Sequence, residues 1–356
     1  MDSPSGATSP IAIYRSDWDP ERGLRLMSSG GGCRPRSAPT PCSSASNWWA
    51  MTRSMSQAED AVGRISLWRG TRATISPLSG GLTNENYLVE AGGERYVMRI
   101  PGASTELLSI DRVNEVHNAR AAASTGIGPA VLEHLPELDV MVLEFIPGPT
   151  MSAQTLQSDG MVRRMAESFK RLHAAPRFLK DFDMFRLIEE YLRIVAAHQV
   201  RIPSDYRERL PLLADIEQAV RVGSLPSVSC HNDLLCENFI DDQHCLRIVD
   251  YELSGNNDPC FDLGNTAQEA NLDDALRAVL CEAYFGRLDR QQLARMNLFA
   301  LMSDVGWTLW GAIQARISTL DFDFTDYYTT RWNRALGVMA SDRFEGWLRE
   351  ARREGP

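Results

Sequence analysis

The spacing of apolar residues divides the chain into two parts of different character. Short runs with the apolar content of β-strands come first, at residues 73–78, 86–90, 95–100 and 140–146. Between the second and third runs, Ala91-Gly-Gly-Glu94 has the composition of a hairpin turn. Residues 112–124 carry alanine and other apolar residues at helical spacing, and Gly126 ends that pattern. The pattern predicts a small, sheet-rich lobe with one helix.

After Pro149 the apolar period becomes that of amphipathic helices. Helices are expected at 159–174, 185–199, 207–222, 272–285, 291–316 and 331–352. Two short strands at 227–230 and 245–250 interrupt them and would form a pair with a polar loop between. A strand-rich lobe followed by a helix-rich lobe predicts a two-lobed α+β enzyme with its site in the crevice. The predicted boundaries are 59–148 for the first lobe and 149–352 for the second.

Residues 1–58 differ from the rest of the chain because they lack any sustained apolar period. They are rich in Ser, Gly, Pro and Arg, so they cannot bury enough surface to offset the entropy of ordering the chain. We expect a disordered leader, or alternatively a biological start at Met51 or Met55. In either case the segment is excluded from the predicted fold.

Composition and charge exclude several classes of function. The chain has 37 basic and 47 acidic side chains, whereas non-specific nucleic-acid binding depends on clustered Lys and Arg. The seven cysteines show no spacing of a secreted disulfide framework, and no secretory signal is recognised, which favours a reducing cytoplasm. The apolar stretch 296–313 is interrupted by Asn297, Ser303 and Asp304. We expect a buried helix there and no stable membrane insertion.

The densest set of polar side chains follows the first of the two short strands in the second lobe. An H-x-D-x-x-x-x-N arrangement places His231, Asp233 and Asn238 in one loop, and Asp250 follows twelve residues later at the end of an apolar run. Phosphoryl transfer needs one aspartate to accept or orient the proton of the attacking hydroxyl, and an Asn and a second Asp to hold magnesium. Alternation places Asp250 on the packed face of its strand. A turn-stabilising role would explain a lone H-x-D, but the four residues together favour catalysis.

The same segment offers five soft or borderline metal ligands, which raises the alternative of a zinc site. They are Cys230, His231, Cys236, His244 and Cys245. Structural zinc sites use C-x(2–4)-C or H-x(3–5)-H pairs, whereas Cys230 and Cys236 are six positions apart. We therefore interpret the cysteines as small buried apolar side chains.

The first lobe carries the parts expected of a nucleotide site. Gly80 and Gly81 lie in a turn between two predicted strands, where glycines let backbone amides approach phosphate oxygens. Arg99 on a later strand could reach the phosphates, and Glu115 on the following helix is placed to pair with it. Taken singly, Glu115 is explained equally well as a solvated carboxylate beside Arg112. Gly-rich turn, strand cation, helix Glu, apolar strand, H-x-D loop and strand Asp follow one another in the order found in kinases.

Taken together, the motifs of residues 73–330 resemble the choline/ethanolamine kinase family, within the aminoglycoside phosphotransferase-like group. The motifs are Gly80-Gly81-Leu-Thr83-Asn84, Val97-Met-Arg99-Ile-Pro-Gly102, Glu144-Phe-Ile146-Pro-Gly148, His231-Asn-Asp233, Val249-Asp250-Tyr-Glu252 and Phe261-Asp-Leu-Gly-Asn265. The resemblance implies a protein-kinase-like fold, ATP and Mg²⁺, Asp233 as catalytic base beside His231, and Asn238 and Asp250 as metal ligands. The nucleotide contacts that it implies are Gly80, Gly81, Thr83, Asn84, Arg99, Glu115, Glu144 and Ile146, the last two as a hinge.

The resemblance extends to a W-x-x-W-x-x-x-Q helix that would bind the acceptor. A quaternary ammonium binds over aromatic faces with a carboxylate nearby, which suits choline. The expected substrate residues are Trp307, Trp310, Asp304, Glu252, Glu269 and Gln314. Without the resemblance, an aromatic stripe at helical spacing would be interpreted as core. No second aromatic wall is evident in residues 269–274, so ethanolamine, thiamine or an aminoglycoside-like polyamine are the alternative acceptors.

The sequence therefore predicts an ATP-dependent phosphotransferase that acts on a small cationic amino alcohol, with choline as the first candidate. The other enzyme hypothesis is phosphorylation of an antibiotic. A pseudokinase-like binding module is the hypothesis from a different class, and the presence of His231, Asp233, Asn238 and Asp250 argues against it. A second copy of the chain is a candidate partner, and nucleic acid is not an expected one.

Overall fold

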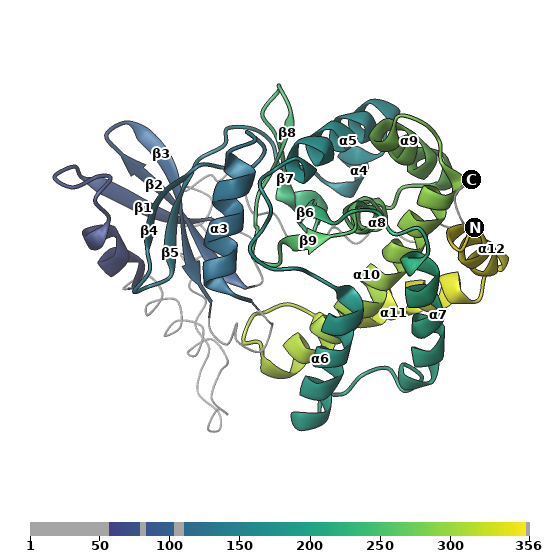
Figure 1. The fold of residues 1–356 in the computed structure, drawn as a ribbon. Coiled ribbons are helices and arrows are strands. Elements are labelled where there is room, and N and C mark those ends of the chain that lie inside the picture. The colour runs from purple at the N-terminus through teal and green to yellow at the C-terminus, as the bar shows by residue number, and fades with distance from the viewer. Residues whose placement is uncertain (1–56, 79–82, 103–109, 354–356) are drawn as a thin grey trace, which may run out of the picture. The chain divides into compact units, whose positions relative to one another are not determined.

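The structure is a computed structural model that describes residues 57–78, 83–102 and 110–353 (Figure 1). The chain forms two compact units. One contains the described residues up to Pro101 together with Leu132–Phe145, and the other contains Gly102–Val131 and the residues from Ile146 onward. The expectation of a disordered leader over 1–58 falls almost entirely outside the described residues, and the chain is helical over 57–64.

The first unit is built on a five-stranded sheet in the order β1-β2-β3-β5-β4. Its strands are β1 Ala73–Leu78, β2 Asn84–Ala91, β3 Glu94–Pro101, β4 Val131–Leu135 and β5 Val140–Glu144. In the β2–β3 hairpin Ala91 is opposite Glu94, and Gly92 and Gly93 adopt positive φ angles of 63° and 87°, which glycine allows without steric cost. The predicted strands and the hairpin are confirmed. Strand β4 was not predicted, because Glu and His interrupt its apolar run.

The core of the first unit lies on one face of this sheet. Val89, Met98 and Val142 belong to it, and Ala58 and Ala61 of the helix 57–64 pack there as well. Alternation along β3 therefore directs Met98 into this core and places Arg99 on the opposite face, where its side chain is also buried.

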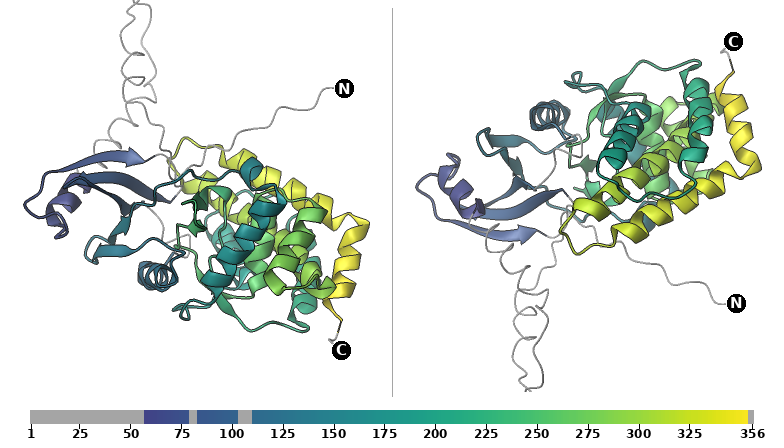
Figure 2. Two further views of the ribbon diagram at one scale, coloured as in Figure 1. Left: turned by 90° about the horizontal axis from the view of Figure 1, so that it is seen from above. Right: turned by 90° about the horizontal axis from the view of Figure 1, so that it is seen from below.

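The second unit is mostly helical, with two small two-stranded sheets. Its helices are α3 Arg112–Ala123, α4 Ala153–Leu156, α5 Asp159–His173, α6 Met184–Ala197, α7 Leu210–Arg221, α8 Pro259–Glu269, α9 Asp274–Phe285, α10 Arg290–Ile317, α11 Phe324–Met339 and α12 Asp342–Ala351. Helices α6, α8, α11 and α12 all pack against α10 (Figure 1, Figure 2). Residues 294–314 of α10 are all buried, as predicted for this segment. No described helix combines the length and the apolar character that crossing a bilayer requires.

The predicted helix over 331–352 is wrong, because the structure has α11 and α12 there with a break at Ala340 and Ser341. The Ser341 hydroxyl donates to the Val338 carbonyl at 2.7 Å, which turns the chain between them. The break lets both helices bury apolar residues against α10, Trp332 from α11 and Phe344 from α12. Helix α8 was also missed, since polar residues occupy many of its buried positions.

The predicted pairing of strands 227–230 and 245–250 with each other is also wrong. β6 Val228–Cys230 pairs with β9 Gly255–Asn257, and β7 Phe239–Asp241 pairs with β8 Leu246–Ile248. Both partner strands are only three residues long, which is too short for a period of two to reveal. The pairings place the loop after β6 and the residues after β8 in one region of the second unit.

Candidate active site

The loop after β6 is closed by hydrogen bonds among its own residues. His231 is fully buried, and its Nε2 lies 2.9 Å from the Val249 carbonyl oxygen, so Nε2 carries the proton that is donated. Its Nδ1 then accepts from the Asp233 backbone N–H at 3.3 Å. The Asn238 side-chain amide donates to the Asp233 carbonyl at 2.8 Å. These bonds fix His231, Asp233 and Asn238 relative to one another, as the sequence motif predicted that they would be grouped.

Helix α8 anchors this loop from outside. The Asp262 carboxylate accepts the backbone N–H groups of His231 and Asn232, each at 2.8 Å. The Asn265 side chain accepts from the Leu234 N–H. Asn232 has a left-handed backbone with φ of 70°, which directs the consecutive N–H groups of His231 and Asn232 to the one Asp262 carboxylate. Sequence reasoning included Phe261–Asn265 only as part of the resemblance and assigned no role to Asp262.

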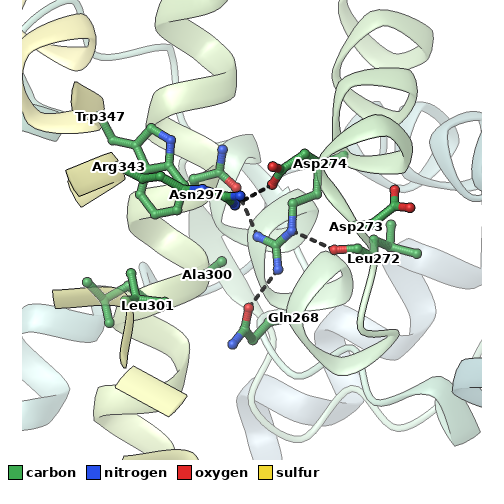
Figure 3. A pocket seen from close by; sticks show the side chains of 11 residues that line it. Gln268, Leu272, Asp273, Asp274, Asn297, Ala300, Leu301, Arg343 and Trp347 are labelled. Carbon is green, nitrogen blue, oxygen red and sulfur yellow. Dashed lines mark hydrogen bonds and ion pairs between the residues drawn. The ribbon is translucent and has the colours of Figure 1, made fainter. Parts of the chain in front are cut away.

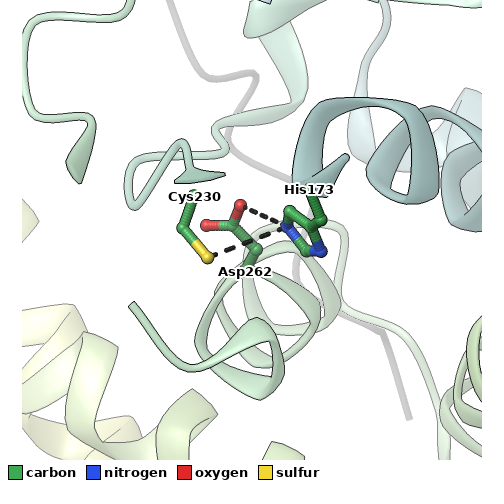
Figure 4. A group of neighbouring side chains, drawn as sticks. All are labelled: His173, Cys230 and Asp262. Carbon is green, nitrogen blue, oxygen red and sulfur yellow. Dashed lines mark hydrogen bonds and ion pairs between the residues drawn. The ribbon is translucent and has the colours of Figure 1, made fainter. Parts of the chain in front are cut away.

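His173, Cys230 and Asp262 form a buried group beside this anchor (Figure 4). His173 Nε2 lies 3.0 Å from Asp262 Oδ2, and its Nδ1 lies 2.7 Å from the Tyr284 hydroxyl. Both ring nitrogens are therefore occupied, and burial raises the pKa of the Cys230 thiol well above its usual value, which keeps it protonated. The group is suited to holding the loop rather than to binding a metal ion.

The zinc alternative gains no support from the part of the chain that the structure describes. Among those residues, His173, Cys230 and Asp262 are the only close group of three potential ligands, and of the five ligands weighed for zinc only Cys230 belongs to it. Cys230 and Cys236 are buried and Cys245 is half-buried. They behave as small side chains within the core.

Two oxygen groups near the loop fit a magnesium ion. Asn238 Oδ1 is buried and has no hydrogen-bond partner among the described residues, which leaves its lone pairs for a cation. Asp250 adopts a left-handed backbone with φ of 74°, a conformation that costs about 1 kcal/mol or more outside glycine and often occurs at functional sites. Strand β8 ends at Ile248, so the predicted alternation does not extend to Asp250. The left-handed turn directs its side chain instead.

Negative charge is concentrated around Asp233. Burial raises the pKa of Asp233 well above its usual value, and three nearby carboxylates raise it further. These belong to Asp250, Glu269 and Glu252. A divalent cation held by oxygen ligands would relieve this repulsion, which agrees with the free lone pairs of Asn238.

Helix α3 belongs to the same unit as the loop, whereas the predicted boundary at 148 placed it in the first lobe. The side-chain amides of Asn114 and Asn118 donate to the Ser254 carbonyl at 2.9 and 3.0 Å and hold the helix there. Glu115 is buried rather than solvated, and Arg112 forms an ion pair with it at 2.7 Å. The same Arg112 nitrogen lies 3.6 Å from Glu252.

The aromatic residues of α10 meet a second set from α11. Trp310 is buried, and its ring is edge-on to Phe324 and Tyr327, with centroid distances of 5.9 and 5.7 Å. These rings form an aromatic cluster with Trp310, and α11 rather than residues 269–274 supplies its second half. The indole N–H groups of Trp307 and Trp310 are buried without a hydrogen-bond acceptor among the described residues.

Tyr191 of α6 is a further residue near this region that the sequence did not indicate. Its hydroxyl is buried and lacks a hydrogen-bond partner within the described ranges. Burial, followed by the charges of Asp233 and Glu252, raises the pKa of Tyr191 well above its usual value. A lone aromatic residue on an apolar helix face gives no sequence signal for such a position.

Two of the three acidic residues predicted at the acceptor site, Asp304 and Glu269, are paired with arginines of α11. Asp304 is fully buried and accepts from Arg334 Nε at 2.7 Å, from Arg334 Nη2, and from Arg331 at 3.4 Å. Glu269 accepts two hydrogen bonds from Arg331, at 2.6 and 3.0 Å. Burial alone would raise the pKa of Glu269, but the Arg331 charge and hydrogen bonds lower it overall. The Arg331 guanidinium also stacks 4.4 Å from the Tyr327 ring centre.

Other predicted site residues are distributed over both units. Gly80 and Gly81 lie outside the described residues. Asn84 is buried and donates to the Thr83 hydroxyl at 3.2 Å. The units contain Thr83, Asn84, Arg99 and Glu144 in the first, and Glu115, Ile146 and Gln314 in the second. The predicted pairing of Arg99 with Glu115 involves one residue from each unit, and so does the predicted hinge at 144–146. Both stay predictions.

Known proteins resemble the chain over most of its length. Residues 74–299 match the Phosphotransferase enzyme family. Ethanolamine kinase 1 of Mus musculus is 29% identical over 312 residues, which cover 75% of this chain and 84% of that protein. A structure of a choline/ethanolamine kinase family protein from Mesorhizobium loti is 33% identical with a TM-score of 0.74, covering 84% of this chain and 99% of that one. Choline kinase LicA from Streptococcus pneumoniae shares the fold, with a TM-score of 0.66 at 24% identity over 76% of this chain and 94% of its own.

Proposed function

The chain belongs to the choline/ethanolamine kinase family of phosphotransferases, and from that premise we propose that it transfers the γ-phosphate of ATP to the hydroxyl of choline. The observation that carries the proposal is the geometry around Asp233. A carboxylate with a raised pKa lies in a loop anchored by Asp262, together with Asn238, whose Oδ1 has no hydrogen-bond partner in the described part of the chain, and the left-handed Asp250. This is the set of groups that phosphoryl transfer requires.

In this mechanism Asp233 accepts or orients the proton of the acceptor hydroxyl. A carboxylate whose pKa is raised by burial is a stronger base toward that proton than an exposed one. His231 keeps the loop in place through its bond to the Val249 carbonyl. Asn238 and Asp250 would hold magnesium, which when bound neutralises the charge that develops on the transferred phosphoryl group.

The nucleotide contacts are proposed from the motif order and the family. They are Gly80, Gly81, Thr83, Asn84, Arg99, Glu115, Glu144 and Ile146. The burial of Arg99 supports its part, because an arginine in a partly desolvated position attracts phosphate more strongly than an exposed one.

Choline is favoured over ethanolamine by the way the acidic residues are paired. A primary ammonium needs hydrogen-bond acceptors, whereas a trimethylammonium group is bound by aromatic faces and needs no acceptor. The lone pairs of Asp304 and Glu269 are directed at Arg331 and Arg334. In the proposal Trp307, Trp310 and Gln314 contact the acceptor, Glu252 and Glu269 attract it through their charge, and Asp304 acts through the arginines.

Ethanolamine is the second candidate acceptor, since Ethanolamine kinase 1 of Mus musculus is similar to the chain over 75% of its length. The test is ADP release by the purified full chain with Mg²⁺ and ATP, against choline, ethanolamine, thiamine and kanamycin. We expect kcat/KM for choline to exceed that for ethanolamine by about tenfold, the effect of about 1.4 kcal/mol. A preference for another acceptor would reject choline and keep the kinase chemistry.

The variant Asp233→Asn distinguishes catalysis from contamination and from a binding role. It should retain ATP binding, measured by calorimetry, and lose turnover of every acceptor. Asp159→Asn is the matched control, because Asp159 is an exposed residue that pairs with Arg163 on the surface at 2.9 Å. ATP binding by the wild type without turnover of any acceptor would instead support the pseudokinase-like module.

A further inference from the structure

The second unit contains a pocket of about 310 Å³ that none of the residues assigned to phosphotransfer lines (Figure 3). It is formed where the end of α8, the start of α9, the middle of α10 and parts of α11 and α12 meet. Its volume is at the lower end of the range for small-ligand sites, so a small molecule rather than a peptide would fill it.

Arg277 is the polar centre of this pocket. Its Nε donates to the Leu272 carbonyl at 2.9 Å, one Nη1–H donates to Asn297 Oδ1 at 2.9 Å, and Nη2 donates to Gln268 Oε1 at 2.7 Å and the Ala267 carbonyl at 3.4 Å. All four acceptors are neutral, and they leave one Nη1–H without an acceptor among the described residues. Burial lowers the pKa of Arg277 to about 10, so the guanidinium is still charged at neutral pH.

The other charged residues of the lining already have partners. Arg343 pairs with Asp274 at 2.9 Å, and both side chains are largely exposed. The Asp273 carboxylate caps α9 by accepting the Leu276 N–H at 2.9 Å. Among the charged side chains that line the pocket, Arg277 and Asp273 form no ion pair with a described residue, and of these two Asp273 is exposed whereas Arg277 is half-buried. The lining carries two arginines and two aspartates, and the charge at its less exposed end is that of Arg277.

The rest of the lining is apolar. It consists of Leu272, Ala300, Leu301, Val338 and the half-buried Trp347. In Figure 3 Trp347 and Leu301 lie on the same side of the pocket. A ligand that matches both ends carries one negative group for Arg277 and an apolar body for this wall.

We propose that this pocket binds a small organic carboxylate with an apolar body, the carboxylate contacting Arg277 and the body contacting Trp347 and Leu301. A carboxylate replaces neutral acceptors by a charged one and so strengthens the hydrogen bonds of a desolvated guanidinium.

Occupancy of the pocket is transmitted to the proposed acceptor site through Gln268. The Gln268 side-chain amide accepts from Arg277 through Oε1 and donates to Asp304 Oδ2 through Nε2, at 2.6 Å. Asp304 in turn contacts Arg331, which holds Glu269. A carboxylate that competes with Gln268 for Arg277 changes this chain of contacts. This step rests on the proposed function, whereas the binding does not.

Binding is tested by calorimetry on the full chain with 3-phenylpropanoate and its neutral analogue 3-phenylpropanamide. We expect saturable binding of the carboxylate and an affinity about tenfold or more lower for the amide, the loss typical of a charged hydrogen bond. Arg277→Met should weaken carboxylate binding by a similar factor, while the matched control Arg343→Met should change it less than about threefold. Equal affinities for the two probes would overturn the proposal.

Arg277 also holds the α8–α9 connection, so its variant could fail to fold. Val338→Trp is the second variant, because it fills the pocket from α11 without touching the guanidinium. It should abolish carboxylate binding in a protein whose circular dichroism matches the wild type. Undiminished binding to Val338→Trp, or no saturable binding to the wild type, contradicts the assignment of the site.

The transmitted effect is tested separately in the turnover assay. Saturating 3-phenylpropanoate should change the acceptor KM by about twofold or more and leave the ATP KM unchanged, and Arg277→Met should remove this effect. Binding without a change in the acceptor KM would overturn the coupling through Gln268. Absence of turnover before any probe is added would reject the proposed function and leave the calorimetric result standing.

Discussion

Two carboxylates of the second unit, Asp233 and Glu269, have pKa values that the protein shifts in opposite directions. Around Asp233, burial and neighbouring acidic residues raise the pKa, so the ionised form is disfavoured. At Glu269, the Arg331 guanidinium overcomes the effect of burial and lowers the pKa. At Asp233 the negative charges repel one another, and a bound cation can relieve that repulsion. At Glu269 the opposite charge is already supplied by an arginine of the protein. Carboxylates of the first kind are suited to chemistry, and those of the second kind to fixing side chains in place.

The largest effect expected from this difference is a separation of activity from stability at Asp233. Asp233→Asn should lower kcat by about 10²- to 10⁴-fold, because an amide cannot accept the hydroxyl proton. The same change should leave the free energy of unfolding equal or higher, since it removes an ionised group that burial disfavours. The turnover assay with Mg²⁺ and ATP measures kcat. Urea unfolding of EDTA-treated protein measures the free energy of unfolding. A clear loss of stability would show that the Asp233 charge is stabilised in the fold.

The converse is expected for Asp304. Asp304→Asn should lower the free energy of unfolding by up to roughly 3–5 kcal/mol, because Asp304 is fully buried and the change takes from the half-buried Arg334 the carboxylate that it pairs with. Catalysis per folded molecule should change far less than for Asp233→Asn. The surface variant Asp159→Asn should cost less than about 1 kcal/mol in the same urea experiment. A stable Asp304→Asn with a greatly raised acceptor KM would instead make Asp304 a direct substrate contact.

The pH dependence of stability should have opposite signs at the two groups. Above pH 3.8 the folded protein binds more protons at Asp233 than the unfolded chain, so its contribution to stability falls as pH rises, by at most about 1.4 kcal/mol per unit. The contribution of Glu269 is present above pH 4.5 and is lost as pH falls below it. Asp233→Asn should remove the first trend and Glu269→Gln the second, measured by urea unfolding from pH 3 to 8 with EDTA. Parallel curves for both variants would contradict the contrast.

The smallest effect is expected at Trp310, which packs with Phe324 and Tyr327. Trp310→Leu should raise the KM for choline by roughly 2- to 30-fold, the range of a cation–π contribution of about 0.5–2 kcal/mol. The KM for ATP should not change. Ethanolamine should be affected less than choline, because a primary ammonium depends more on hydrogen bonds. Equal changes for both acceptors would assign Trp310 to packing alone.

The grouping of polar residues in the loop after β6 could be predicted from sequence because these residues are close along the chain. The side-chain bonds of His231 and Asn238 span at most eighteen residues, and the motif spacing already carries this part of the geometry, whereas the anchor to Asp262 spans 31 residues. Asp250 was predicted as a residue, but its left-handed backbone was not, since alternation describes only extended chain.

Arg331 and Arg334 were missed for the opposite reason. Arg331 meets Glu269 across 62 residues, and Arg334 meets Asp304 across 30. On an amphipathic helix two arginines are ordinary surface residues, and nothing local distinguishes a buried one. The break between α11 and α12 could not be predicted either, because the apolar period continues through it.

The seating of α8 against α10 depends on Gly264. A β-carbon at this position would lie 2.3 Å from the Met296 carbonyl oxygen and 2.7 Å from the Ala300 nitrogen, so any larger residue would push the two helices apart. Helix α8 carries Asp262, which anchors the loop after β6, and α10 carries Trp310. The absence of a side chain at Gly264 thus sets the spacing between the loop proposed for catalysis and the helix proposed to contact the acceptor. A larger residue at position 264 would displace both α8 and α10 without altering any group proposed to contact a substrate.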